Sequence, residues 1–183
     1  MVDLMKSATF KLCVFGDGGV GKTTLVNKYI LGRFLESTKM TIGVDITSKR
    51  FEMDDVKINL QIWDFGGEER FRFFLPAYAR GSSGGIFIYD ITRYNSLMNL
   101  SEWLNVFDIS VHGKQYDVPI LMVGSKLDLQ NDRCISKEDA INSVQNHNVY
   151  NVIECSSKTG QNIELIFEDI TKQILNCVNL IYK

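Results

Sequence analysis

Short runs of apolar residues recur along the chain, and each is followed by a polar segment or by apolar residues at helical spacing. Runs of this length are typical of strands that are buried on both faces of a sheet. The predicted strands cover residues 8–15, 44–53, 56–63, 85–89, 120–124 and 149–155. Only Asp54 and Asp55 separate the second strand from the third, and this spacing predicts an antiparallel hairpin.

Apolar residues that recur three and four positions apart predict four helices among these strands. Ser96 is a candidate N-cap of the second helix, and Ser136 with Asp139 resembles a capping box at the start of the third. The last helix is expected to begin near Asn162 and to bury one apolar stripe. The apolar positions that define the helices are, in chain order, Leu25, Val26, Tyr29 and Ile30; Leu97, Leu100, Trp103, Leu104 and Phe107; Ala140, Ile141 and Val144; and Leu165, Ile166, Ile170, Ile174, Cys177, Val178 and Ile181.

Two segments lack such periodicity. Residues 32–40 are predicted to be a mobile loop and residues 64–81 an irregular stretch. Strands and helices alternate elsewhere, with no internal repeat or linker. The sequence therefore predicts a single α/β domain over residues 1–183, with a doubly wound, six-stranded, mostly parallel sheet that has one antiparallel hairpin strand. Helices should cover both faces, and a ligand should bind beyond the carboxyl ends of the strands.

The composition excludes several classes of function. Hydrophobic residues make up 45% of the chain and charged residues 23%, and a net charge of -2 argues against non-specific nucleic-acid binding. No apolar run approaches the roughly 18 residues of a membrane span, and no signal peptide is evident. Cys13, Cys134, Cys155 and Cys177 show no C-x-x-C spacing, which predicts reduced thiols and a cytoplasmic location.

Residues 16–24 carry the clearest chemical signal, because they fit the pattern G-x-x-x-x-G-K-S/T. Glycines allow positive φ and bring backbone N–H groups close to phosphate oxygens. Lys22 is expected to reach the β and γ phosphates, and the Thr23 hydroxyl to bind Mg²⁺. A Gly-rich surface turn is the alternative, but the strand before and the helix after favour a phosphate loop. The expected contacts are Gly16, Asp17, Gly18, Gly19, Val20, Gly21, Lys22, Thr23 and Thr24.

Four later segments carry a family resemblance. Residues 42–45, 61–64, 69–72 and 89–92 read Ile-Gly-Val-Asp, Gln-Ile-Trp-Asp, Glu-Arg-Phe-Arg and Tyr-Asp-Ile-Thr. With the phosphate loop, they make the chain resemble the Ras-superfamily small GTPases over essentially its whole length, and most closely the Rab branch. The resemblance implies a P-loop, small G-protein fold and a molecular switch that binds GTP or GDP with Mg²⁺ and hydrolyses GTP. It also implies a monomer. Compared with typical Rabs, the stretch at residues 108–118 is a few residues longer, which predicts a surface insertion.

The resemblance assigns roles around the γ phosphate. Thr41 would lie in the first switch segment, where its hydroxyl completes Mg²⁺ coordination and its N–H meets the γ phosphate. Asp64 would hold Mg²⁺ through water, and the Gly67 N–H would bond the γ phosphate. The candidate catalytic residues are Lys22, Thr41, Gly67 and Glu68.

The resemblance also implies a guanine site at residues 125–128 and 156–158. Asp128 would accept hydrogen bonds from guanine N1–H and N2–H₂, a pair that adenine lacks, although a solvated turn residue is the alternative. Phe34 would stack on the base, or else anchor its loop in the core. The expected base contacts are Phe34, Ser125, Lys126, Asp128, Ser156, Ser157 and Lys158.

Two residues depart from the family pattern. Ser125 replaces an Asn that braces the phosphate loop, which predicts looser nucleotide binding. Glu68 replaces a Gln that orients the attacking water. An ionised carboxylate cannot donate toward the phosphoryl group, and about 4 Å from the γ phosphate it adds repulsion of about 1 kcal/mol even in bulk water. We therefore expect slow intrinsic hydrolysis. The alternative functions are a nucleotide-dependent binding module that hardly hydrolyses, and a small P-loop kinase, which would have no use for Asp128.

Large apolar residues on the segments expected to move with the γ phosphate predict a surface for effector and regulatory proteins. Its expected members are Ile42, Val44, Ile46, Trp63, Phe73, Phe74 and Tyr78, whereas Phe71 and Leu75 fit the core equally well. Ile46 stands where the Rab effector patch has its third aromatic residue. The chain as given ends without a C-a-a-X or paired-cysteine signal, so its C-terminus does not support membrane attachment unless a lipidated tail has been removed.

Overall fold

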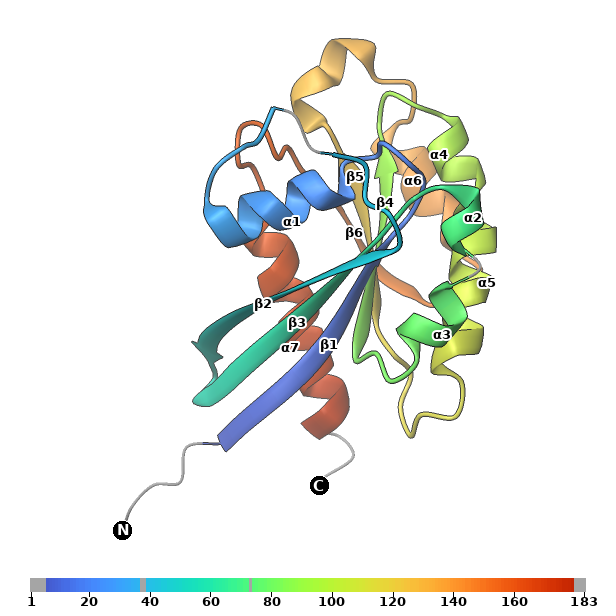
Figure 1. The fold of residues 1–183 in the computed structure, drawn as a ribbon. Coiled ribbons are helices and arrows are strands. Elements are labelled where there is room, and N and C mark those ends of the chain that lie inside the picture. Colours follow the sequence, from blue (N-terminus) through green and yellow to red (C-terminus); the bar gives the residue numbers. More distant parts are fainter. Residues whose placement is uncertain (1–5, 37–38, 73, 180–183) are drawn as a thin grey trace.

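A six-stranded sheet with strand order β2-β3-β1-β4-β5-β6 runs through the centre of the protein (Figure 1). We describe it from a computed structural model, which covers residues 6–36, 39–72 and 74–179. The strands are β1 (Lys6–Phe15), β2 (Val44–Met53), β3 (Val56–Phe65), β4 (Gly84–Asp90), β5 (Ile120–Ser125) and β6 (Val149–Glu154). Only β2 and β3 pair antiparallel, so the predicted sheet and its hairpin are confirmed.

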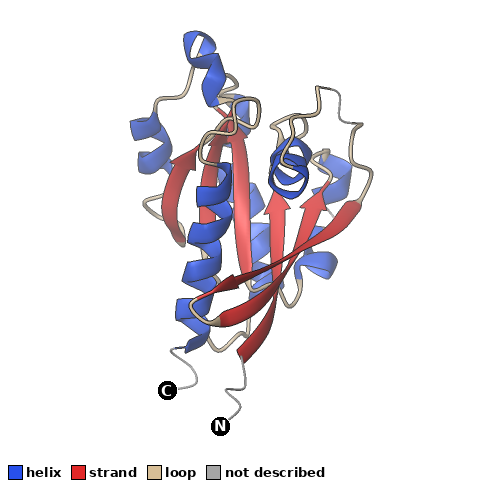
Figure 2. Cartoon of the chain, turned by 90° about the vertical axis from the view of Figure 1, so that its left-hand side faces the viewer, coloured by secondary structure: helices blue, strands red, loops and turns tan. Residues whose placement is uncertain are grey.

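Helices cover both faces of the sheet (Figures 1 and 2). One face carries α1 (Lys22–Leu31) and α7 (Ile163–Asn179), and the other carries α3 (Leu75–Ala79), α5 (Leu100–Val111) and α6 (Lys137–Ser143). The short helices α2 (Glu69–Arg72) and α4 (Asn95–Met98) and a 3₁₀ helix (Leu127–Asp132) lie in the connections. No helix in the described part of the chain is long and apolar enough to cross a bilayer.

Two apolar cores lie on the two faces of the sheet, because β4 and β5 are buried along their whole length. Under α1 and α7, Tyr29 stacks on Phe167 with ring centroids 3.7 Å apart. On the opposite face, Phe15 stacks on Phe107 at 4.8 Å. The predicted apolar face of Leu97, Leu100, Trp103, Leu104 and Phe107 is buried in this second core.

Residues 64–81, predicted to be irregular, and residues 108–118, predicted to be an insertion, contain more regular structure than the sequence indicates. Residues 64–81 are not irregular throughout, because α2 and α3 lie within them. Neither helix is long enough to show a helical period in the sequence. Of the predicted insertion at residues 108–118, the first part continues α5 to Val111 and Val118 is buried, so only the residues between them form a surface connection.

The prediction for Ser96 is wrong, and that for Ser136 is confirmed. Ser96 is buried inside α4, where its Oγ donates to the Arg93 carbonyl at 2.6 Å and accepts from the Asp90 N–H at 3.0 Å. The tight turn after β4 uses this hydroxyl to satisfy its own backbone. By contrast, Ser136 caps α6, since its Oγ accepts from the Asp139 N–H at 3.0 Å.

Among its members within the described residues, the predicted stripe of α7 is right except at the first. Leu165 is 48% exposed, whereas Ile166, Ile170 and Ile174 are fully buried. The stripe also missed the buried apolar residues Ile163, Phe167 and Leu175, because the helix turns the face at 163, 166, 167 and 170 toward the sheet. Ile181 and Phe73 lie outside the described residues.

Candidate functional site

The phosphate loop connects β1 to α1 at the carboxyl edge of the sheet. Gly16 has φ 137° and packs so closely on the Ile88 backbone that a Cβ would overlap the carbonyl. Gly21 precedes α1 with φ 99°, in the left-handed region. Lys22, 5% exposed, donates to the carbonyls of Gly16 at 2.9 Å and Asp17 at 2.7 Å. Burial lowers the pKa of Lys22 to about 8, although Asp64 and Asp17 oppose that shift.

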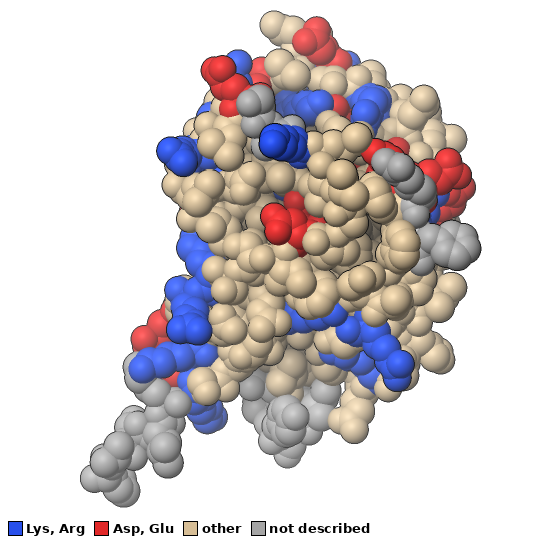
Figure 3. All heavy atoms as spheres, viewed as in Figure 1, with Lys and Arg blue, Asp and Glu red and all other residues tan. Residues whose placement is uncertain are grey.

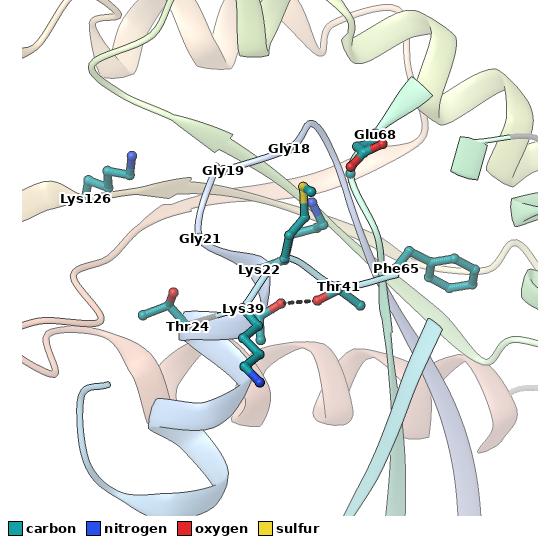
Figure 4. Close-up of a pocket in the computed structure, with 13 residues that line it drawn as sticks. Gly18, Gly19, Gly21, Lys22, Thr24, Lys39, Thr41, Phe65, Glu68 and Lys126 are labelled. Carbon is teal, nitrogen blue, oxygen red and sulfur yellow. Dashed lines mark hydrogen bonds between the residues drawn. The ribbon is translucent and has the colours of Figure 1, made fainter. Parts of the chain in front are cut away.

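A cavity of about 290 Å³ lies against this loop (Figure 4). Figure 4 shows Glu68 and Lys126 at opposite ends of it, with Lys22 between them. A Cβ on Gly67 would overlap the Lys22 amine and the Asp17 backbone, so only glycine fits there. The lining residues are Gly18, Gly19, Gly21, Lys22, Thr23, Thr24, Lys39, Met40, Thr41, Phe65, Gly67, Glu68 and Lys126. Of the predicted phosphate-loop contacts, Gly16, Asp17 and Val20 do not line it.

Three oxygen donors meet below the loop. The Thr23 hydroxyl donates to Asp64 Oδ2 at 2.5 Å, and Thr41 Oγ1 lies 2.8 Å from Thr23 Oγ1. Asp64 is 1% exposed, and its other oxygen is buried without a hydrogen-bond partner. Burial raises the pKa of Asp64 to about 6, against the hydrogen bond from Thr23 and the charge of Lys22. An orphaned carboxylate oxygen beside two hydroxyls fits a hard cation such as Mg²⁺.

A second cavity of about 340 Å³ continues from the first and shares Gly21, Thr24 and Lys126 with it. Phe34 and Asp128 lie on its wall. Its lining residues are Gly21, Thr24, Phe34, Leu35, Glu36, Ser125, Lys126, Asp128, Leu129, Ser157 and Lys158. Phe34 is partly exposed, so the alternative that it anchors its loop in the core is wrong.

Hydrogen bonds fix the polar groups of the second cavity from behind. Ser156 does not line the cavity, but its hydroxyl donates to Asp128 Oδ1 at 2.5 Å. Lys126 has a left-handed φ of 64°, and its amine pairs with Asp90 at 2.6 Å. Burial alone would raise the pKa of Asp90, but hydrogen bonds from Lys126 and Thr92 outweigh burial and lower the pKa.

Ser125 braces the phosphate loop, although it is shorter than the asparagine that it replaces. Its hydroxyl donates to the Val20 carbonyl at 2.5 Å, and the residue is buried. β5 thus places a hydroxyl donor against the phosphate loop, and looser nucleotide binding stays a prediction.

Arg93 was missed by sequence reasoning. It donates to the Gly18 carbonyl at 2.7 Å and lies beside Gly19. Its position just beyond β4 was the available signal, because loops at the carboxyl edge of a doubly wound sheet face the ligand site.

The segments expected to move with the γ phosphate are here called the switch segments. Their apolar residues lie partly at the surface. Ile42 is 78% exposed and Ile46 54%, and Phe74 and Tyr78 are also exposed. Val44 and Trp63 are half-buried, Phe71 is half-buried, and Leu75 belongs to the core. Figure 3 shows one face of the molecule with an acidic patch near its middle, uncharged residues around that patch, and basic side chains below it and along the left side.

Comparison with known proteins gives consistent matches along most of the chain. A family model described as the Ras family matches residues 11–176. Ras-related protein Rab-7a of Paramecium octaurelia is 36% identical over 168 residues, which are 91% of this chain and 82% of the relative. Rab7 of Drosophila melanogaster is 37% identical over 171 residues, which are 93% of this chain and 82% of the relative. The region matched by the family model includes both cavities.

Proposed function

Because this chain belongs to the Ras family, whose members are GTPases, we propose that it is a switch whose two cavities hold one guanine nucleotide. The observation that carries the proposal is the junction of these cavities at Gly21, Thr24 and Lys126. One cavity has the phosphate loop on its wall, and the other has Asp128. A nucleotide has the same two halves, a polyanionic tail and a base.

The phosphate half depends on positive charge and on backbone groups. The Lys22 amine, now bonded to two carbonyls, would turn to the β and γ oxygens. The N–H groups of Gly18, Gly19 and Gly67 would meet the phosphate oxygens. Thr23, Thr41 and, through water, Asp64 would hold Mg²⁺, which would supply positive charge against the charge that develops on the β and γ phosphates.

The base half selects guanine by hydrogen bonding. Asp128, oriented by the Ser156 hydroxyl, would accept from N1–H and N2–H₂. The backbone near Ser157 and Lys158 would donate to O6, and the Lys126 stem would lie along the ring. Phe34 and Leu35 would cover the edge of the base.

Because of Glu68, the proposal includes slow hydrolysis of GTP. It lies at the end of the first cavity opposite Lys126, next to Gly67 (Figure 4). A carboxylate there repels the γ phosphate and cannot donate to it while ionised. The same residue favours a second candidate, a binding module that holds GTP and hardly hydrolyses it.

The exposed apolar residues of the switch segments would contact effectors and regulators, with Ile42, Ile46, Phe74 and Tyr78 as the accessible members. The proposal also includes a single, monomeric domain over residues 1–183. Its four cysteines are all unpaired, which supports a reducing, cytoplasmic setting.

Four measurements test this function. The nucleotide carried by the purified protein is identified, and binding of GTP, GDP and ATP is compared by competition in magnesium buffer. A higher affinity for GTP and GDP than for ATP supports the proposal, and an equal affinity for guanine and adenine nucleotides contradicts it.

Asp128→Asn should then shift the preference from GTP toward XTP, because an amide donates to the xanthine 2-oxygen that a carboxylate repels. Phosphate release with Mg²⁺ separates a hydrolase from a module that only binds.

A further inference from the structure

Asp17 belongs to the phosphate loop, but its carboxylate does not line the cavity. It accepts the indole N–H of Trp103 at 2.8 Å and the side-chain amide of Asn99 at 2.8 Å. Trp103 is a fully buried residue of α5, and Asn99 directly precedes this helix. Asp17 therefore fastens the phosphate loop to a rigid part of the core.

Arg72, the last residue of α2, reaches the same carboxylate. Its Nη2 lies 3.6 Å from Asp17 Oδ1, and its guanidinium lies over the Trp103 ring, 4.6 Å from the centroid. Arg72 also pairs with Glu102 on α5. The side chains of Arg72 and Asp17 are only 16% and 17% exposed, so solvent screens their attraction less than that of a surface pair.

The contacts of Asp17 with Gly67 and Arg72 hold both ends of the short segment between these two residues. Gly67 packs against the backbone of Asp17, and Arg72 pairs with its side chain. The residues between them include Glu68, which lines the first cavity. With both ends held by one loop residue, the segment has little freedom to carry Glu68 away from the cavity.

The contacts that hold residues 67–72 against Asp17 occur together with a contact between Thr41 and the candidate Mg²⁺ site. In the same structure, Thr41 bonds Thr23 at the candidate Mg²⁺ site, and Gly67 lies against Lys22. Both are the positions expected when a γ phosphate is present, since Thr41 and Gly67 are the residues proposed to meet it. The contact between Asp17 and Arg72 is therefore present in the same structure as the positions that the proposed function assigns to the triphosphate-bound state.

We propose that Arg72 is a positioning residue, and that its contact with Asp17 and Trp103, here called the latch, holds Glu68 at the cavity and stabilises the GTP-bound state over the GDP-bound state. The inference rests on the proposed function. A γ phosphate that draws in Gly67 closes the latch, and by linkage a closed latch raises affinity for the triphosphate. A latch equally closed in both states would change neither affinity relative to the other.

The test compares the affinities of wild type and Arg72→Met for a non-hydrolysable GTP analogue and for GDP. Methionine keeps much of the apolar stem and removes the charge. The ratio of the two affinities should fall by about five-fold or more, the lower range of typical coupling between sites. Arg72→Lys should recover part of it, and Arg50→Met, at an exposed position on β2, should leave it unchanged. Thermal unfolding of each variant checks that it folds.

Trp103 supplies a second readout that a merely structural role would not move. Its indole N–H is observed by NMR, with Trp63→Phe used to assign the two indole signals. Arg72→Met should shift the Trp103 signal in the analogue-bound protein and much less in the GDP-bound protein. Equal shifts in both states, or an unchanged affinity ratio in a wild type that binds GTP, would overturn the latch alone. A wild type that binds no guanine nucleotide would overturn the proposed function and the latch with it.

Discussion

Glu68 is the single residue on which the rate of the proposed reaction depends most. At 4 Å from a γ phosphate, its charge costs about 1 kcal/mol in water and about 4 kcal/mol at an effective dielectric of 20. Glu68→Gln should therefore speed single-turnover GTP hydrolysis by about five-fold or more, because the amide removes the charge and restores a donor. Phosphate release from GTP-loaded protein with Mg²⁺ measures the rate. A wild type that hydrolyses as fast as the variant would refute this account.

We expect Ser125 to slow nucleotide dissociation through its bond to the backbone of the phosphate loop. Ser125→Ala removes the donor to the Val20 carbonyl, and a buried acceptor left unsatisfied costs about 1–3 kcal/mol. The loop then loses a brace, so GDP should dissociate about five-fold to a hundred-fold faster if that cost falls on the bound state. Release of a fluorescent GDP, chased with unlabelled GDP, gives the rate. Ser48→Ala, at an exposed site on β2, is the control and should leave the rate unchanged.

Single-residue inference from the sequence was strongest where a motif demands one chemistry. Lys22 and Thr23 were chosen from the phosphate-loop pattern and Asp64 from the family resemblance, and the structure brings the three together beside the first cavity. Arg93 and the Ser125 bond were not foreseen, because each depends on how far a side chain reaches across the sheet edge. No local pattern encodes that distance.

Among the elements, α7 separates a buried position from an exposed one within a single turn. Ile166 is fully buried and Leu165 is half-exposed, although both fit an apolar stripe in the sequence. Ile166→Ala should lower the free energy of unfolding by about 2–5 kcal/mol, through lost burial and a residual cavity. Leu165→Ala should change it by less than about 1 kcal/mol.

Urea unfolding of both α7 variants, with GDP and Mg²⁺ at fixed concentrations, checks this difference. Equal destabilisation by the two substitutions would mean that α7 turns a different face to the sheet.

Long elements were predictable and short ones were not. The strands and α1, α5, α6 and α7 follow apolar runs or spacing of several residues, and their ends differ from the structure by a few positions. By contrast, α2 and α3 are a single turn or little more, and α3 depends on the packing of Leu75 and Ala79 into the core.

Across the whole molecule, the four cysteines report how well the two cores exclude solvent. Burial raises the pKa of Cys13 to about 11 and that of Cys155 to about 12, so both are protonated at pH 8. A thiol reagent should modify the exposed Cys134 rapidly and the half-buried Cys177 slowly. Cys13 and Cys155 should react only in denaturant, and raising the pH to 9 should not recruit them.

Counting the thiols modified over time in the native and the unfolded protein tests this. Reaction of more than two thiols in the folded protein would show that at least one core opens to solvent. Loss of the signal in Cys134→Ser would identify the rapid site.

Overall architecture was the most predictable level, since alternating strands and helices leave few arrangements of a doubly wound sheet. The first described strand begins and α7 ends at the pole opposite the two cavities (Figure 2). That separation has a practical use. A surface tether or fluorophore joined beyond α7 would leave the openings of the two cavities facing bulk solution, so the proposed nucleotide exchange and effector binding could be recorded on immobilised molecules.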